Sequence, residues 1–431
     1  MHEDFLHFIW KHQYFEKAGL ETSDGECINI LKPGIHNFGS GPDFSEAKVK
    51  VGDLTWTGNI EIHRNASEWK LHRHNTDPAY NNVILHIVWN DDKTVFREDG
   101  TKIPTLQIQD RVDKELMDSY HDLLNFHEDI LCKPWLKNVD KITLVGMLEK
   151  ALISRLAKKA EVVRELVENC QGDWEEASYR LLAMNFGFKV NTGPFLQLSK
   201  AVPLKVLLKN ADNLFKLEAL LFGQAGFLSG RSADDYMAQL KNEYRFLMHK
   251  YALDENVLQS SVWKFGRLRP PNFPTLRIAQ LSAVIHSMKN IFSAMISAGS
   301  IQVLRHMISV TPGAYWNNHY RFGEITKNKS SIPGKDSVDV LIINTAVPLL
   351  AAYSKHTDDQ QYMDRAVSHL QMIAPESNRI IAGWDGAGVT ASSSADSQGM
   401  IELFNEYCLK KNCLSCNIGM SILKRSAFRD G

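Results

Sequence analysis

Residues 39–89 constrain the fold more than any other stretch of this 431-residue chain. On both sides of Gly52-Asp53, apolar or small residues alternate with polar ones. Alternation with a period of two predicts β-strands, and a Gly-Asp pair between two such runs predicts a tight turn. The sequence therefore predicts a β-hairpin whose second strand carries Glu61 and His63 on the same face.

A third polar residue, Asp43, stands just before the first strand of this hairpin and directly after Gly41-Pro42. Because the strands run antiparallel, the start of the first strand lies beside the end of the second, where Glu61 and His63 are expected. Magnesium and manganese ions bind such carboxylates, polarise a phosphodiester and lower the pKa of a bound water. We therefore predict a catalytic site in which Asp43 and Glu61 bind Mg²⁺ or Mn²⁺ and His63 is the third catalytic residue.

Pro42-Asp43 and Glu61-Ile62-His63 resemble the Pro-Asp and Glu-x-Lys signature of the PD-(D/E)xK nuclease superfamily, with His63 in place of the lysine. The order of predicted elements is also similar. It comprises a helix over 3–15, a strand over 27–31, the hairpin, a short helix near 67 and a strand over 83–89. The resemblance implies an α-β-β-β-α-β core, cleavage of DNA or RNA, and the role of the lysine for His63.

More polar residues follow the hairpin, and we predict His72, His74 and Asp77 as accessory groups. Imidazole together with carboxylate suits Zn²⁺, Mn²⁺ or Fe²⁺. Binding of a phosphate by Arg73 and His74 is an alternative, and so is a surface loop without function. His86 lies between apolar residues of a predicted strand and is interpreted as a core histidine.

Three cysteines form a second candidate metal site near the C-terminus, with the spacing C-x4-C-x2-C. Clustered thiolates suit Zn²⁺ or an iron–sulfur cluster, and each takes four ligands. Three reduced thiols at a helix end are the alternative. The clustered residues are Cys408, Cys413 and Cys416; Cys132 is the first candidate for the fourth ligand, with Cys27 and Cys170 as alternatives.

Beyond residue 125 the apolar residues recur at helical spacing. The sequence therefore predicts an α+β protein, with a PD-(D/E)xK-like α/β domain over 1–125 and an α-helical domain over 126–431. Expected helices include 174–185, 214–221, 233–251, 276–298 and 364–373, a buried core helix is expected over 340–353, and further strands are expected over 94–97 and 105–108.

The formal net charge is −1, so any binding to DNA or RNA requires a local basic patch. Arg73 and three arginines in the aromatic and proline-rich loop 263–277 are the candidates: Arg267, Arg269 and Arg277. A rigid structural loop set by its prolines is the favoured interpretation of 263–277. No signal peptide precedes the first helix and run 340–353 is too short to cross a bilayer, so we expect a cytoplasmic protein without a membrane partner.

Several longer runs resemble the bacterial family called domain of unknown function 2851, among them GPDFSEAKVKVGDLTWTGNIEIH, WKFGRLRPPNFPTLRIAQ and YCLKKNCLSCNIG. That resemblance implies a bacterial protein and no particular activity. From its residues, the first hypothesis is a metal-dependent nuclease or phosphodiesterase. A non-catalytic nucleic-acid-binding or scaffold protein on a degenerate nuclease core is one alternative. A zinc-dependent hydrolase centred on His63, His72, His74 and Asp77 is another.

Overall fold

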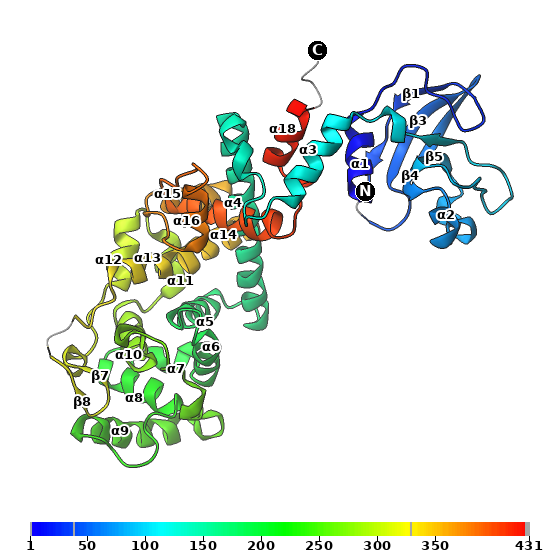
Figure 1. Ribbon diagram of the computed structural model, residues 1–431. Coiled ribbons are helices and arrows are strands. Elements are labelled where there is room, and N and C mark those ends of the chain that lie inside the picture. The colour runs from blue at the N-terminus through cyan, green and yellow to red at the C-terminus, as the bar shows by residue number, and fades with distance from the viewer. Residues whose placement is uncertain (1, 38, 328–329, 427–431) are drawn as a thin grey trace. The chain divides into compact units, whose positions relative to one another are not determined.

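The computed structural model describes residues 2–37, 39–327 and 330–426. The chain divides into two compact units (Figure 1). Unit 1 comprises Met1–Met147, Gly383–Val389 and Leu403–Gly431, and unit 2 comprises Leu148–Ala382 and Thr390–Glu402. The division differs from the predicted boundary at residue 125, because the C-terminal segment returns to unit 1 and packs against the helix that ends at Asn125.

Unit 1 contains a mixed β-sheet with the strand order β1-β3-β4-β5-β6, and β2 pairs with β3. Strands β1, β3 and β4 are antiparallel, whereas β4, β5 and β6 are parallel. Helix α1 packs on β4 (Figure 1). The elements are α1 (Glu3–His12), β1 (Ile28–Lys32), β2 (Ile35–His36), β3 (Phe44–Val51), β4 (Leu54–Asn65), α2 (Glu68–Leu71), β5 (Val83–Asn90), β6 (Thr105–Gln107), α3 (Lys114–Asn125) and α18 (Asn417–Ser426).

The predicted hairpin is present as β3 and β4, but the burial of β4 departs from a period of two. Leu54 and Trp56, predicted on the apolar face, are 63% and 41% exposed, whereas residues 60–63 are all buried. The first half of β4 pairs only with β3, so it forms an exposed hairpin end. From Asn59 onward β4 also pairs with β5, and α1 packs on it. Glu61 and His63 are therefore interior residues and not a solvent face.

Gly58 permits the close approach of the chain that enters β5. A Cβ atom at this position would lie 2.5 Å from both the Asn82 carbonyl oxygen and the Ile84 Cγ2 atom. We expect Gly58→Ala to destabilise unit 1 by about 1–3 kcal/mol through overpacking, measured as a lower urea midpoint. Gly146→Ala is the matched control, since a Cβ atom added there would meet nothing within 4 Å apart from its own helix backbone, and alanine favours helix. Equal midpoints for the two variants would contradict this account.

Unit 2 is mainly helical and encloses the largest apolar core of the described chain. Helix α4 (Lys141–Asn169) begins in unit 1 and continues into unit 2. The remaining elements are α5 (Trp174–Phe186), α6 (Thr192–Ala201), α7 (Leu204–Leu208), α8 (Leu214–Gln224), α9 (Asp235–Tyr251), α10 (Pro274–Ser287), α11 (Ile291–Ser297), α12 (Ile301–Ile308), β7 (His319–Arg321), β8 (Glu324–Ile325), α13 (Lys335–Asn344), α14 (Ala346–Thr357), α15 (Gln360–Gln371), α16 (Arg379–Asp385) and α17 (Ser394–Leu403).

Three sequence predictions about elements need correction. The helix expected over 276–298 is two helices, α10 and α11, because the backbone leaves helical geometry at Met288. The core helix expected over 340–353 is divided between α13 and α14 at Thr345, where φ is −122° and ψ is −70°. The strand expected over 94–97 is reduced to a single bridge between Phe96 and Lys102.

Lys335–Thr357 is long and apolar enough to cross a membrane by length and composition. However, 78% of its most apolar window is buried inside the structure. The buried position predicted for 340–353 is therefore confirmed.

Candidate metal centre

Asp43 and Glu61 lie side by side, because antiparallel pairing places the start of β3 beside the middle of β4. The Asp43 backbone N–H donates to Glu61 Oε2 at 3.1 Å, and the Ile62 N–H donates to Asp43 Oδ2 at 2.9 Å. The side chain of Asp43 is 22% exposed and that of Glu61 is 6% exposed. The pair thus combines a carboxylate that reaches solvent with one that is buried.

Helix α1 contributes two titratable groups to the Asp43 side of this pair. His7 Nε2 lies 3.3 Å from Asp43 Oδ2. Burial opposes charging of His7, but the hydrogen bond and charge of Asp43 outweigh it and raise its pKa. Burial, followed by the charge of Asp43, raises the pKa of Glu3 to about 7. Neither residue was predicted from the sequence; the available signal was a glutamate and a histidine four residues apart in a predicted helix, hence on one face.

The turn after α2 is anchored by Trp69, which is 1% exposed and donates its Nε1–H to the Phe96 carbonyl at 3.1 Å. Directly after α2, Arg73 adopts the left-handed conformation, with φ of 63°. This reversal turns His72 and His74, two residues apart, toward the same point above β4. Their convergence therefore depends on the turn and not on an extended strand.

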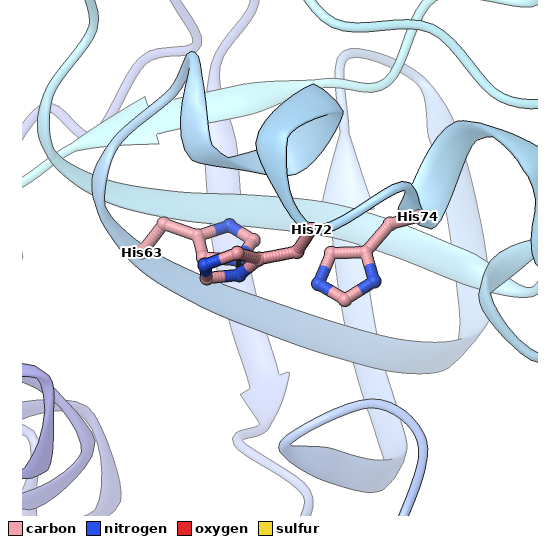
Figure 2. Close-up of side chains that lie close together, drawn as sticks. All are labelled: His63, His72 and His74. Carbon is pink, nitrogen blue, oxygen red and sulfur yellow. Dashed lines mark hydrogen bonds between the residues drawn. The ribbon is translucent and has the colours of Figure 1, made fainter.

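His63, His72 and His74 form a compact imidazole group (Figure 2). One ring nitrogen from each lies within 4.8 Å of the other two. His72 Nδ1 is 3.2 Å from His63 Nε2.

Glu61 completes this group from β4. Its Oε1 atom is 3.3 Å from His74 Nε2 and 3.6 Å from His63 Nε2. A tetrahedral ion with ligands at about 2.0–2.1 Å separates those ligands by about 3.3 Å. These three separations agree with this value. Ring nitrogens of the three histidines lie within 4.8 Å of one another and Glu61 contacts two of them, so these four residues are the candidate ligands of the centre.

The role of the family lysine does not suit His63. Burial, together with the neighbouring His86, His74 and His72, lowers the pKa of His63 to about 2. The ring is 1% exposed and is neutral at neutral pH, so it supplies no positive charge. A neutral imidazole is instead the form that binds a metal ion. His63 therefore lacks the positive charge of a lysine at this position, and its catalytic role stays a prediction.

His86 is fully buried, as its interpretation as a core histidine requires, and it also supports the imidazole group. Its Nε2 lies 2.8 Å from His63 Nδ1, and burial lowers its pKa to about 3. When His63 Nδ1 donates to this neutral ring, the lone pair of His63 Nε2 is left for a metal. Such a partner behind a ligand fixes its tautomer and orientation.

The other predicted accessory residues take different positions. Asp77 accepts the Ala79 N–H at 2.9 Å and caps a short helix, so we do not include it among the ligands. Arg73 is exposed beside the two histidines that flank it in sequence.

Arg277 is not available to a nucleic acid. It is 3% exposed and donates to Gln280, Asn272 and Ser337 inside unit 2. Its predicted role in binding nucleic acid is therefore corrected to a structural one. Arg267 and Arg269 are exposed, and their role stays a prediction.

The four cysteines proposed as a metal site lie together in unit 1 and line one cavity: Cys132, Cys408, Cys413 and Cys416. The two alternatives for the fourth ligand lie elsewhere. Cys170 belongs to unit 2, and Cys27 is exposed and pairs with Glu21.

The model of the family described as "Protein of unknown function (DUF2851)" matches residues 3–379. The chain belongs to the DUF2851 family. No curated protein and no solved structure matches this DUF2851 protein. The family match includes Asp43, Glu61 and the three histidines, and it ends before the clustered cysteines of the C-terminal segment.

Proposed function

We propose that this DUF2851 protein is a metal-dependent phosphodiesterase that cleaves nucleic acid. The observation that carries the proposal is the carboxylate pair Asp43 and Glu61, in which Glu61 also faces two imidazoles at 3.3 and 3.6 Å. Paired carboxylates with neutral imidazoles are typical of hydrolytic metal sites.

Each residue of the centre has a role that follows from its position. Glu61 and the three histidines would hold the metal, which would supply a Lewis acid for the phosphoryl oxygen and lower the pKa of a water. Asp43 is the partly exposed carboxylate beside them, and it would orient the attacking water and accept its proton. His7 in turn holds Asp43 in place at 3.3 Å.

The three imidazole ligands influence which metal ion the centre prefers. Magnesium prefers oxygen ligands, whereas imidazole suits transition-metal ions. Between the two ions expected from the sequence, Mn²⁺ is therefore favoured over Mg²⁺. The same three imidazoles favour the zinc-dependent hydrolase as the second candidate, with Glu61 as the carboxylate in place of Asp77.

Two features support a phosphodiester substrate. Arg73 is exposed and lies between His72 and His74 in the sequence, and guanidinium groups pair with phosphate oxygens. The succession α1, β1, β3, β4, α2 and β5, with β5 parallel to β4, is also the order expected from the PD-(D/E)xK resemblance once the short β2 is set aside.

The test is a cleavage assay on chelator-treated protein with Mn²⁺, Zn²⁺ or Mg²⁺ added back. Substrates are double-stranded DNA, single-stranded DNA, RNA and bis(p-nitrophenyl) phosphate. We expect Mn²⁺-dependent cleavage that falls by about 100-fold or more in Asp43→Asn, as for loss of a general base. Asp53→Asn, which alters an exposed carboxylate in the hairpin turn, should cleave like the wild type.

Asp43 was predicted from the sequence as a metal ligand, but in the proposed arrangement it lies beside the four ligands, so Asp43→Asn should still bind Mn²⁺. Absence of cleavage by the wild type with every metal and substrate would overturn the proposal and favour a binding or scaffold protein. Equal cleavage by Asp43→Asn and Asp53→Asn would remove Asp43 from the catalytic site.

A further inference from the structure

Four buried or half-buried thiols converge in unit 1 from separate parts of the chain. Cys132 directly precedes a short helix (Lys133–Asn138), and the other three lie in the C-terminal segment. With Leu131, Tyr407 and Gly419, all four line one cavity. This site is separate from the imidazole group in its residues, and the proposed hydrolysis makes no use of it.

The backbone around the C-terminal cysteines is shaped for this convergence. A Cβ atom on Gly419 would lie 2.3 Å from the Cys413 carbonyl oxygen, so glycine lets α18 approach that turn closely. Lys411 is in the left-handed conformation, with φ of 54°, and its Nζ donates to the Leu124 carbonyl at 3.0 Å. The chain thus folds back between Cys408 and Cys413 and brings both to one cavity.

The charge of Lys411 favours the thiolate of Cys413, but burial and the neighbouring thiol outweigh it. Burial, and then the neighbouring thiols, raises the pKa of Cys413 to about 12 and the pKa of Cys132 well above its usual value. None of the four cysteines forms a disulfide, so no disulfide accounts for the cluster. A bound cation offsets the repulsion between four thiolates, and metal binding releases the protons.

The spacing of the sulfur atoms distinguishes between metals. In the described part of the chain, one ring nitrogen from each of the three histidines lies within 4.8 Å of the other two. No three of the cysteine sulfur atoms in the described residues lie that close to one another. A single zinc ion with Zn–S bonds of about 2.3 Å holds its sulfurs about 3.8 Å apart. An iron–sulfur cluster holds them farther apart, because its own irons and sulfides lie between the thiolates.

We infer that Cys132, Cys408, Cys413 and Cys416 bind an iron–sulfur cluster. The cluster joins the C-terminal segment to the region around Cys132 and has a structural role in unit 1. Metal binding at such a site contributes directly to folding stability.

The test uses the full chain, purified without oxygen, and measures iron, acid-labile sulfide and zinc per chain together with the visible absorption spectrum. We expect iron and sulfide in about equal amounts, as in both cluster types held by four cysteines, and a visible absorption that dithionite bleaches. Cys416→Ser should lower iron and sulfide at least about fivefold. Cys170→Ser, which alters a free cysteine of unit 2, should leave both unchanged.

Several outcomes would overturn the inference. One is a single zinc per chain without sulfide. Another is unchanged iron and sulfide in Cys416→Ser. The third is wild-type protein that holds no iron after purification without oxygen and after incubation with ferrous iron and sulfide. Where Cys416→Ser does not fold, the metal and sulfide content of the wild type decides alone. None of these readouts depends on phosphodiester cleavage.

Discussion

Replacing Glu61 with glutamine is expected to lower phosphodiester cleavage by about 1,000-fold without lowering the stability of the metal-free protein. Metal catalysis is worth several kcal/mol, and each 1.36 kcal/mol is a factor of ten in rate. Glu61 faces His63 and His74 through one oxygen and accepts the Asp43 N–H through the other. Loss of this carboxylate therefore removes the ligand that contacts both the imidazole group and Asp43.

The stability of this variant follows from burial. Burial raises the pKa of Glu61; the His74 hydrogen bond opposes this rise and the charge of Asp43 adds to it. A buried charge without a counterion is costly, whereas a glutamine carbonyl still accepts the Asp43 N–H. Metal-free Glu61→Gln should therefore have a urea midpoint equal to or above that of the wild type.

Two measurements check this result: Mn²⁺ binding by calorimetry and unfolding in urea with chelator present. Glu46→Gln is the control, since Glu46 lies on the same hairpin and its side chain is 68% exposed. If Glu61→Gln bound Mn²⁺ as tightly as Glu46→Gln, Glu61 would not be a ligand. A lowered urea midpoint together with lost cleavage would instead assign Glu61 a structural role.

The second large effect is expected in unit 2, at Glu218. This glutamate is fully buried, and its Oε2 accepts hydrogen bonds from the Tyr236 hydroxyl and from Trp316 Nε1 at 3.2 Å. Burial raises its pKa to about 7, from an ordinary value of 4.5. Between pH 4.5 and about pH 7, Glu218 keeps its proton in the folded chain and has lost it in the unfolded chain. The free energy of unfolding therefore falls as pH rises. Above about pH 7 the full loss is on the order of 3 kcal/mol.

Glu218→Gln removes this titration, so we expect the free energy of unfolding of unit 2 to lose most of its slope between pH 5 and pH 7. Urea unfolding followed by tryptophan fluorescence measures that slope, and Trp316 reports from the site itself. If the glutamine amide destabilises the folded protein, it does so equally at every pH, so this slope is unaffected. Glu255→Gln, at an exposed glutamate, should keep the wild-type slope. An unchanged slope in Glu218→Gln would show that Glu218 is ionised in the folded protein.

The hairpin and the contact of Asp43 with Glu61 could be predicted from the sequence because both depend on local signals. Alternation defines the strands, Gly52-Asp53 defines the turn, and the antiparallel register then brings the two carboxylates together. The burial of Glu61 and His63 could not be predicted in this way. It depends on parallel pairing with β5 and on packing of α1, which are contacts between distant parts of the chain.

The difference between local signals and long-range contacts also explains the outcome for other predicted residues. His72 and His74 meet because Arg73 adopts a positive φ, which no residue type other than glycine signals clearly. Arg277 appeared in an arginine-rich loop, but it is buried and donates to Ser337, which is distant in the sequence. Cys132 could be proposed only by counting ligands, since nothing near it in sequence indicates a partner.

The return of the C-terminal segment to unit 1 has a consequence for biosynthesis. Helix α18 packs against α3, and Arg425 donates to the Asn138 carbonyl oxygen. A ribosome therefore releases the sheet, α3 and the whole of unit 2 before it releases the last residues that complete unit 1. Domains generally fold as units during synthesis, N-terminal first. In this chain the domain that starts first is finished last, so a nascent or truncated chain has a complete helical unit while its sheet-containing unit still lacks its closing helix.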